Sequence, residues 1–337
     1  MPKPLLDLDA TPERLRALAD AGVLTPSALE RALHLSVATP PREAWRRFLS
    51  TTLMGLGALL VLAGVIYFFA YNWAQMHRFA KLGLIAAAIS GAVVGAWRQG
   101  DTLGGRLSLL AASVLVGPLL AVYGQAYQTG ADPYGLFLGW AVLILPWVAV
   151  SRFAPLGLLA LVLVNTGIGL YWEQVLEARY DDPHWLAVVL GGLNGFVWAT
   201  YEHFANLRVS WLQARWPPRV LAVMAVAPVL IAAVPFVVSP SRAHPGALVA
   251  TALVLASLAA EYALHRHLRG ELFMLTLGAV SVMTLLTSGA VSVVFDSYRD
   301  VEVLGLFMLP LFVIGQVALA VWWLRHEARA TGATEES

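Results

Sequence analysis

Charged residues are scarce in this chain, and cysteine is absent. Asp, Glu, Lys and Arg make up 13% of its 337 residues, whereas soluble domains carry roughly 25%. Apolar residues make up 59%, so the composition excludes a water-soluble fold. Without cysteine the chain forms no disulfide, thiol nucleophile or cysteine-bound metal site. A net charge of +1 gives no general basic field, so we expect no nucleic-acid partner.

Long apolar runs make up most of the sequence. The 30 residues from Phe48 to His77 contain no Asp, Glu, Lys or Arg, and about 20 apolar residues suffice to span a bilayer as a helix. The candidate spans are about 51–71, 80–97, 106–124, 134–150, 154–172, 184–202, 218–238, 246–264, 272–294 and 303–324. They predict an all-α polytopic transmembrane helix bundle of about ten spans, with the lipid bilayer as its surroundings.

The distribution of basic residues predicts the orientation of these spans. If the N-terminus is cytoplasmic, 17 of the 22 Lys and Arg residues fall on the cytoplasmic side. Cytoplasmic loops retain such an excess, and an even number of spans places both termini there. The first 47 residues contain no short apolar region typical of a cleavable signal peptide, so we expect the first span to direct insertion.

Residues 11–37 predict a small cytoplasmic helical hairpin. Each helix would begin with Thr-Pro, at Thr11 and Thr25, and the first would end at Gly22, since Thr caps helix starts and Gly favours helix ends. A segment of this size rarely forms a core alone. We therefore expect it to dock on the membrane domain, on a second copy or on an envelope or cytoplasmic protein partner, with a plain tether as the alternative.

Two segments carry the most distinctive motifs. One is GVIYFFAYNWAQMHRFAKL at 64–82, and the other is VYGQAYQTGADPYGLFLGWAVLILP at 122–146. With the hairpin, they resemble a family of predicted bacterial membrane proteins known as domain of unknown function 2157, over about residues 10–150. The resemblance implies an inner-membrane location and a cytoplasmic hairpin, and no established chemistry. Residues 150–337 contain no motif that matches.

Both motifs fall at the outer ends of their spans under the orientation above. We expect an outward-facing polar patch that binds a ligand; its residues are Asn72, Trp73, Gln125, Tyr127, Gln128 and Asp132. The alternative for the aromatic residues is an interfacial belt. The alternative for the amides is hydrogen bonding between helices, because amides near hydrocarbon need partners.

Acidic residues fringe the same outer side: Asp132, Glu173, Glu177, Asp181, Asp182, Asp296, Asp300 and Glu302. The simplest interpretation is a solvated rim. A mouth that collects cations is the alternative, since clustered like charge attracts counter-ions.

Features within the spans predict packing. We expect close helix contacts at small-residue pairs: Gly91 and Gly95, Gly135 and Gly139, and Gly191 and Gly195. We expect hydrogen bonds between helices at the deep amides: Asn165, Asn194 and Gln316. Prolines inside the spans should act as kinks for packing: Pro118, Pro146, Pro228, Pro235 and Pro310. Broken helices at a transport site are the alternative, but the two halves show no convincing repeat.

No catalytic site, metal site or cofactor site is evident. Glu202 and Glu261 lie near inner ends of spans, where we expect structural roles, with Glu261 reaching the interface or pairing with a base. A Glu/His metal cluster of Glu202, His203, His265 and His267 is conceivable by spacing only, because no motif fixes two ligands on one helix face. No ionisable residue lies near the middle of a span, which weighs against a proton-coupled transporter.

The chain thus divides into a hairpin and basic juxtamembrane segment at 1–47, four family-like spans at 48–150, six further spans at 151–325 and a disordered tail at 326–337. We predict a non-enzymatic inner-membrane protein, acting as a scaffold or sensor, whose outer patch binds a small solute, a lipid headgroup or an envelope partner. The first alternative is a transporter of a neutral or cationic small solute. The second alternative is a membrane enzyme on lipid-linked envelope substrates.

Overall fold

The chain is a bundle of long helices. The computed structural model describes residue 10 and residues 12–37, 42–72, 76–128, 130, 132–177, 179–264, 272–297 and 302–335. Within these ranges it contains helices and no strand. The α-helices are α1 (Pro12–Asp20), α2 (Pro26–Val37), α3 (Arg42–Asn72), α4 (Arg78–Gln99), α5 (Leu103–Tyr127), α6 (Pro133–Ser151), α7 (Ala154–Tyr171), α8 (His184–Asn206), α9 (Trp216–Val238), α10 (Pro245–Leu264), α11 (Leu272–Ser297) and α12 (Glu302–Glu335).

The all-α membrane fold predicted from the sequence is confirmed. In the part of the chain that the structure describes, nine helices are long and apolar enough to cross a membrane, namely α3 to α7 and α9 to α12. The tenth predicted span is α8, which has the same 23-residue length as α9. It is not among the nine, and its polar residues include Asn194 and Glu202, both of which are buried in the protein.

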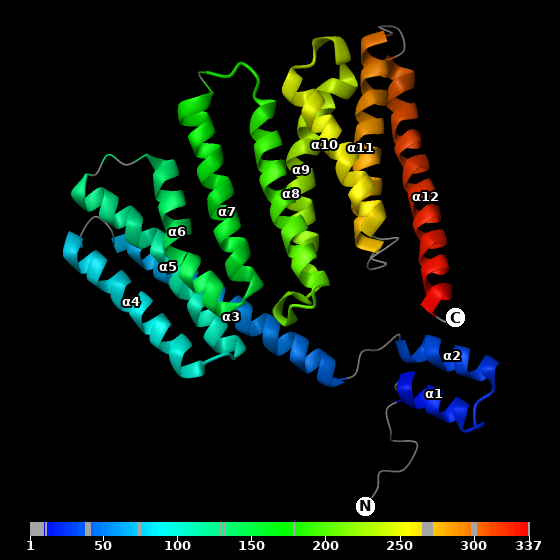
Figure 1. Cartoon of the computed structure of the whole chain (residues 1–337), viewed down its shortest axis with the longest axis horizontal. Helices are drawn as coiled ribbons and strands as arrows, with labels where there is room; N and C mark the ends of the chain where they lie inside the picture. The colour runs from blue at the N-terminus through cyan, green and yellow to red at the C-terminus, as the bar shows by residue number, and fades with distance from the viewer. Residues whose placement is uncertain are drawn as a thin grey trace, which may run out of the picture.

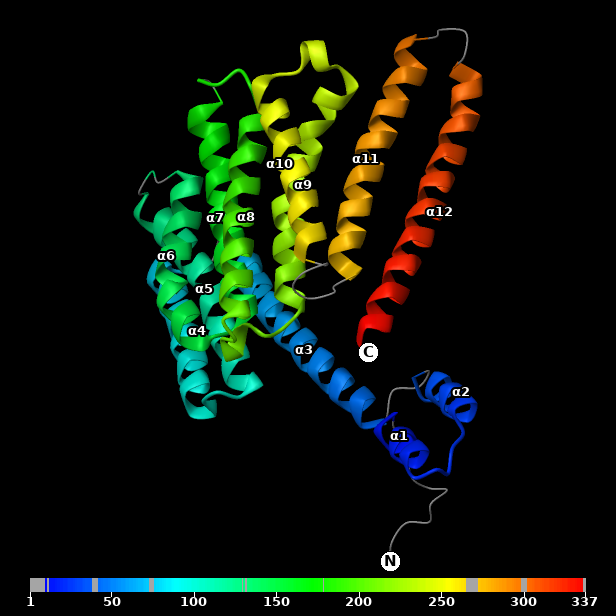
Figure 2. The ribbon, with the colours of Figure 1, turned by 45° about the vertical axis from the view of Figure 1, so that its right-hand side comes forward.

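Helices adjacent in sequence run antiparallel and mostly pack side by side (Figures 1 and 2). The closest pairs are α4 with α5, α6 with α7, α8 with α9, and α9 with α10. The connections after α5, α7 and α9 therefore lie at one end of the bundle. The opposite end holds the α1–α2 hairpin and the end of α12 (Figure 1), as the alternation of spans predicts.

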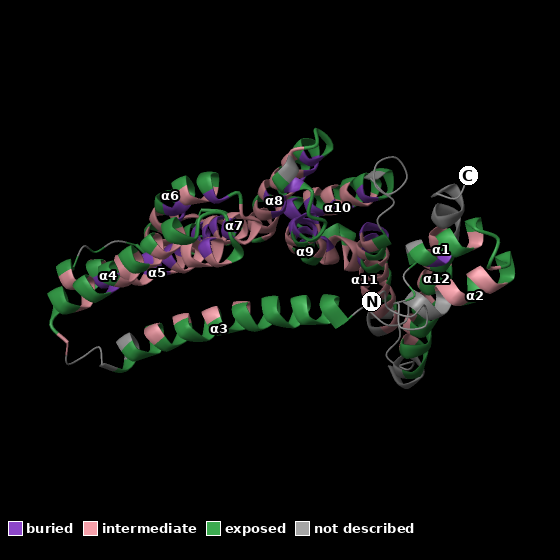
Figure 3. Cartoon of the chain, turned by 90° about the horizontal axis from the view of Figure 1, so that it is seen from below, coloured by how far each residue is buried: buried purple, intermediate pink, exposed green. Residues whose placement is uncertain are grey.

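Helix α3 differs from the others because the rest of the chain covers almost none of it. Seen from below, it lies apart from the row of other helices and is exposed along most of its length (Figure 3). Its main contact is near its C-terminal half, where Val65 packs against Ile85 of α4 and Val122 of α5. In a bilayer the exposed apolar side chains of α3 from Phe48 onward would contact lipid.

The three predicted small-residue pairs differ in packing: the pair at Gly191 packs tightly, Gly95 makes an ordinary contact with Ser108 of α5 at 3.5 Å, and the pair at Gly135 meets open space. A Cβ atom added at Gly191 would clash with Val229 and lie 3.0 Å from the Ala225 carbonyl oxygen, both on α9. At Gly91, Gly135 and Gly139 such an atom would meet nothing within 4 Å. The prediction is wrong for those glycines because spacing alone does not tell whether a small face meets a helix or lipid.

The predicted hydrogen bonds between helices are confirmed. Asn165 on α7 and Asn194 on α8 donate to each other's side-chain oxygens at 3.0 and 2.8 Å. Asn194 also donates to the Met224 carbonyl of α9 at 3.2 Å, so one buried amide links three helices. Gln316 of α12 donates to Thr287 of α11 at 3.4 Å.

The N-terminal hairpin has the predicted ends. Gly22 adopts a φ of +74° after α1, and the Thr25 hydroxyl accepts from the Ala28 amide at 3.4 Å at the start of α2. Thr11 lies outside the described residues. Leu15 is buried while Leu18 is 41% exposed, so the rest of the chain covers only part of the apolar side of α1.

At the other end of the chain, α12 continues to Glu335. This helix runs through residues 326–335, for which we expected a disordered tail. The segment begins with residues 326–330, which include Ala, Arg and Glu, and these residues favour the helical conformation. The helix therefore continues beyond the apolar span.

Candidate functional site

The α5–α6 connection brings most of the predicted patch together. α5 ends at Tyr127, and Gln128 follows in the left-handed conformation with a φ of 47°. Gly130 also has a positive φ, of 60°. Asp132 then precedes α6 as its N-cap residue, but its side chain makes no capping hydrogen bond. The reversal is therefore made by backbone conformation, which leaves the polar side chains available at the surface.

These polar side chains face outward from the turn. Gln125, Gln128 and Asp132 are exposed, and Tyr127 is 48% exposed. The Tyr127 ring packs against Tyr123, one helical turn earlier, at 4.7 Å between ring centroids. The Tyr134 hydroxyl interacts with the Asp132 carboxylate. The result is a rim with amide, carboxylate and phenol groups within one connection.

A groove opens between the ends of α5 and α6 beside this rim. Its volume is about 580 Å³, within the usual range for small-molecule sites. Gln125 lines it together with Tyr123 and a set of glycines, Gly124, Gly130, Gly135 and Gly139. Gln125 makes no hydrogen bond to any residue that the structure describes, so its amide is available to a ligand. Tyr127, Gln128 and Asp132 lie around the groove and do not line it.

The first motif is described only in part. α3 ends at Asn72, near the start of α4, but the Asn72 side chain and all of Trp73 lie outside the described residues. Their part in the patch stays a prediction.

The opposite end of the same helix pair has a second groove. It has a volume of about 460 Å³ and is lined by α4, α5 and α6, including Trp97, Arg106, Trp147 and Ser151. Arg106 forms an ion pair of 2.8 Å with Asp101 there. A packed layer separates the two grooves.

Trp140 of α6 forms the centre of that layer. Its indole N–H donates to the Ser113 carbonyl of α5 at 2.7 Å, and its ring lies where a side chain at Gly117 would be. Around it, Val116, Ala141 and Ile144 are buried in one apolar cluster. The middle of the α5–α6 pair is therefore closed.

Residues 16–157 match the model of the family called Predicted membrane protein (DUF2157). This confirms the resemblance predicted over about residues 10–150. No curated protein and no solved structure matches the chain.

The DUF2157 match contains both grooves of the α5–α6 pair and ends at the start of α7. It does not extend over the remaining helices, where the structure shows two further sites around buried acidic residues, a polar cluster at Asp182 and a largely apolar cavity at Glu261.

The first cluster beyond the DUF2157 match corrects the interpretation of Asp182 as part of a solvated rim. Asp182 is 8% exposed. Its carboxylate accepts from the backbone amides of Gly246 and His184 at 2.6 and 3.0 Å and lies 2.7 Å from the His184 ring Nδ1. Although burial alone would raise the pKa of Asp182, these hydrogen bonds lower it below its usual value. Asp182 therefore ties the α7–α8 loop to the start of α10.

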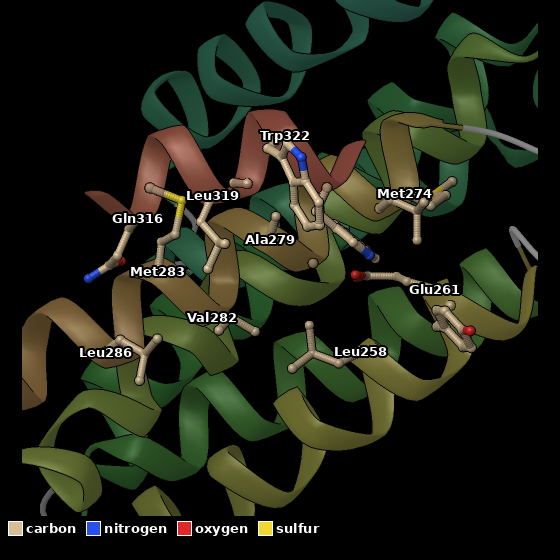
Figure 4. A pocket seen from close by; sticks show the side chains of 15 residues that line it. Leu258, Glu261, Met274, Ala279, Val282, Met283, Leu286, Gln316, Leu319 and Trp322 are labelled. Atoms are coloured by element: carbon tan, nitrogen blue, oxygen red, sulfur yellow. The ribbon is translucent and has the colours of Figure 1, made fainter. Parts of the chain in front are cut away.

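The second site is the cavity at Glu261, which lies on the last turn of α10. We expected Glu261 to reach the interface or pair with a base, but it is 1% exposed and faces a cavity between α10, α11 and α12 (Figure 4). That expectation is wrong because α11 covers the side of α10 that carries Glu261. The sequence places Glu261 near the end of a span, but that position does not show which face of the helix a neighbouring helix covers.

Metal binding receives no support from the described residues, which contain no group of three or more His, Asp or Glu that could hold an ion. Glu202 and His203 line one cavity between α8, α9 and α10. His265 and His267 lie outside the described residues, so the conceivable cluster of these four residues stays untested.

Proposed function

We propose that this protein is an inner-membrane ligand-binding protein whose outward-facing groove between α5 and α6 receives a small polar solute or a lipid headgroup. The observation that carries this proposal is the groove itself. It combines an accessible amide, Gln125, with an open glycine wall at the end of two membrane helices. We infer a scaffold or sensor, not an enzyme, because the described residues that line this groove include no nucleophile with a base.

The orientation in the proposal follows from charge. Placing the α1–α2 hairpin in the cytoplasm puts 17 of 22 Lys and Arg residues on that side. The α5–α6 turn then faces the outside of the inner membrane. A ligand could approach from the outer compartment or along the headgroup layer.

The chemistry of the rim favours a ligand with hydrogen-bonding groups and no net negative charge. Gln125 and Gln128 each offer amide donors and an acceptor, and Asp132 supplies a negative charge at the rim. The glycine wall leaves room, since a Cβ atom at Gly135 or Gly139 would meet nothing within 4 Å.

Groove filling tests the proposal. A Gly139→Leu substitution adds a side chain to the groove, whereas Gly169→Leu adds one on α7, where a Cβ atom also meets nothing within 4 Å. The purified protein would be screened by thermal unfolding against small sugars, small amines and glycerophosphoethanolamine. We expect at least one compound to raise Tm for the wild type and G169L, and not for G139L or Q125L. Equal responses in all four proteins, or none in any, would contradict the proposal.

Transport is the second candidate, and one observation favours it. The grooves at the two ends of the α5–α6 pair lie on opposite sides of the Trp140 layer. Passage would require this layer to part, as in alternating access. Uptake of a groove ligand by proteoliposomes, blocked by G139L and not by G169L, would establish transport. Binding without uptake would leave the scaffold or sensor function.

A further inference from the structure

A cavity between α10, α11 and α12 lies outside both the outer groove and the DUF2157 match. Its volume is about 500 Å³, and its walls are largely apolar. Leu258, Met283, Leu286 and Leu319 line it, as Figure 4 shows. Gln316 lies at one end of the cavity and Glu261 at the other (Figure 4). Such a combination of an apolar body and a few polar groups is typical of a ligand site.

The carboxylate of Glu261 has no compensating group within the described chain. Both oxygens are buried, and neither has a hydrogen-bond partner among the residues that the structure describes. Burial of an isolated carboxylate is costly unless it is paired, hydrogen-bonded or protonated. The side chain points from α10 into the cavity (Figure 4), so a bound molecule could supply the missing partner.

The neighbouring helix leaves room for this carboxylate. A Cβ atom at Gly278 of α11 would lie 2.9 Å from the nearer Glu261 oxygen. A glycine at this position therefore lets the carboxylate lie between α10 and α11, and any other residue would force it to move.

The walls of the cavity indicate the rest of the ligand. Leu286 is 53% exposed, and Leu319 and Trp322 are each 65% exposed. The cavity thus opens sideways between helices toward the surface that lipid would cover. An aliphatic chain could enter from there. The indole ring of Trp322 adds a face that attracts cations.

We propose that Glu261 and this cavity bind an amphiphilic amine, whose ammonium group pairs with the Glu261 carboxylate while its aliphatic chain lies along α11 and α12. The ammonium supplies both the positive charge and the hydrogen-bond donors that the carboxylate lacks. This site is independent of the outer groove. The same chemistry is present in an aminophospholipid and in a free lipophilic amine.

Dodecylamine is a suitable probe for the purified full-length protein in a neutral detergent. We expect it to raise Tm in a saturable manner, whereas dodecanol, which has the same chain without the charge, should have little effect. E261Q should weaken the apparent affinity by about tenfold or more, since a charge-assisted hydrogen bond contributes about 1.5–3 kcal/mol. E202Q, which changes another buried glutamate of the bundle, should respond as the wild type does.

Two results would overturn the site. Equal stabilisation by dodecanol would mean that the cavity binds only the chain, and an unchanged response of E261Q would mean that the amine binds elsewhere. If E261Q does not fold, Leu286→Trp can be tested in its place. Its larger side chain fills part of the cavity and should abolish the dodecylamine response.

Native mass spectrometry distinguishes the source of the amine. The protein would be extracted from nanodiscs that contain phosphatidylethanolamine and phosphatidylglycerol in equal amounts. Preferential retention of phosphatidylethanolamine by the wild type and not by E261Q would assign a membrane lipid. Dodecylamine binding without such retention would assign a free lipophilic amine. Absence of both would reject the proposal.

Discussion

Two asparagine side chains, Asn165 and Asn194, join three helices through a small hydrogen-bonded cluster. Hydrogen bonds between membrane helices contribute on average about 0.6 kcal/mol each and rarely exceed 1.7. We expect Asn194→Ala to lower the free energy of unfolding by about 1–3 kcal/mol, because it also leaves Asn165 without its partner. Unfolding of the purified protein by denaturant in detergent would measure this loss.

The matched control is the pair of Asn→Leu substitutions. Each single substitution leaves the other asparagine without its partner, whereas the double substitution removes both amides. The double variant should therefore lose less stability than the sum of the losses of the two single variants. Additive losses would mean that the two side chains do not interact in the membrane protein.

Asp182 is a second residue whose effect can be measured, through pH. Its pKa is lower in the folded protein than in the unfolded chain, because hydrogen bonds from Gly246 and His184 outweigh the effect of burial. The stabilisation is therefore present above the unfolded pKa of about 3.9 and is lost as pH falls through the folded value. The His184 ring beside this carboxylate packs against His244, with 5.9 Å between the ring centroids, and Asp181 is the adjacent residue in the chain.

We expect the Tm of the wild type to fall more steeply below about pH 4 than that of Asp182→Asn. The variant itself should be less stable at neutral pH by about 1–3 kcal/mol, because the amide cannot accept all the bonds of the carboxylate. Parallel Tm curves for the two proteins between pH 3 and 5 would show that Asp182 has no special part in stability.

At the scale of helices, the contact between α8 and α9 gives a matched pair of glycines. Gly191→Ala places a methyl group against Val229 and the Ala225 carbonyl, so α8 and α9 must separate or repack, at a cost of about 1–3 kcal/mol. Gly192→Ala places the same group where nothing lies within 4 Å, and should be neutral or slightly stabilising, since Ala favours a helix more than Gly does.

Thermal unfolding of G191A and G192A would test this packing. A lower Tm for G192A than for G191A would mean that the wrong face of α8 has been assigned to α9.

Helix positions could be predicted from the sequence more fully than helix contacts. Apolar length predicted the membrane helices within a few residues, except that α3 begins earlier and α12 ends later than expected. The Thr-Pro and Gly signals predicted the helices of the N-terminal hairpin. The same reasoning could not separate Gly191, which packs tightly, from Gly91 and Gly139, which do not. A residue pattern shows which helix faces are small or apolar. Which helix packs against each face depends on the three-dimensional arrangement of the bundle.

The candidate sites show the same limit. Gln125, Gln128 and Asp132 lie within one turn of chain, so their proximity follows from local sequence. Asp182 contacts Gly246, 64 residues away, and Glu261 faces residues of α11 and α12. No local signal indicates these distant partners, which is why both carboxylates were expected at the surface.

For the molecule as a whole, the proposed function requires the α5–α6 groove to face outward. The lack of native cysteine allows single cysteines to be placed at Gln125 and Gln128, with Gln213 in the α8–α9 loop as the control at the opposite end. Intact cells would be treated with a membrane-impermeant maleimide. We expect labelling at positions 125 and 128, and labelling at 213 only after permeabilisation. Labelling of 213 in intact cells, with 125 and 128 protected, would contradict the orientation and the groove's proposed function together.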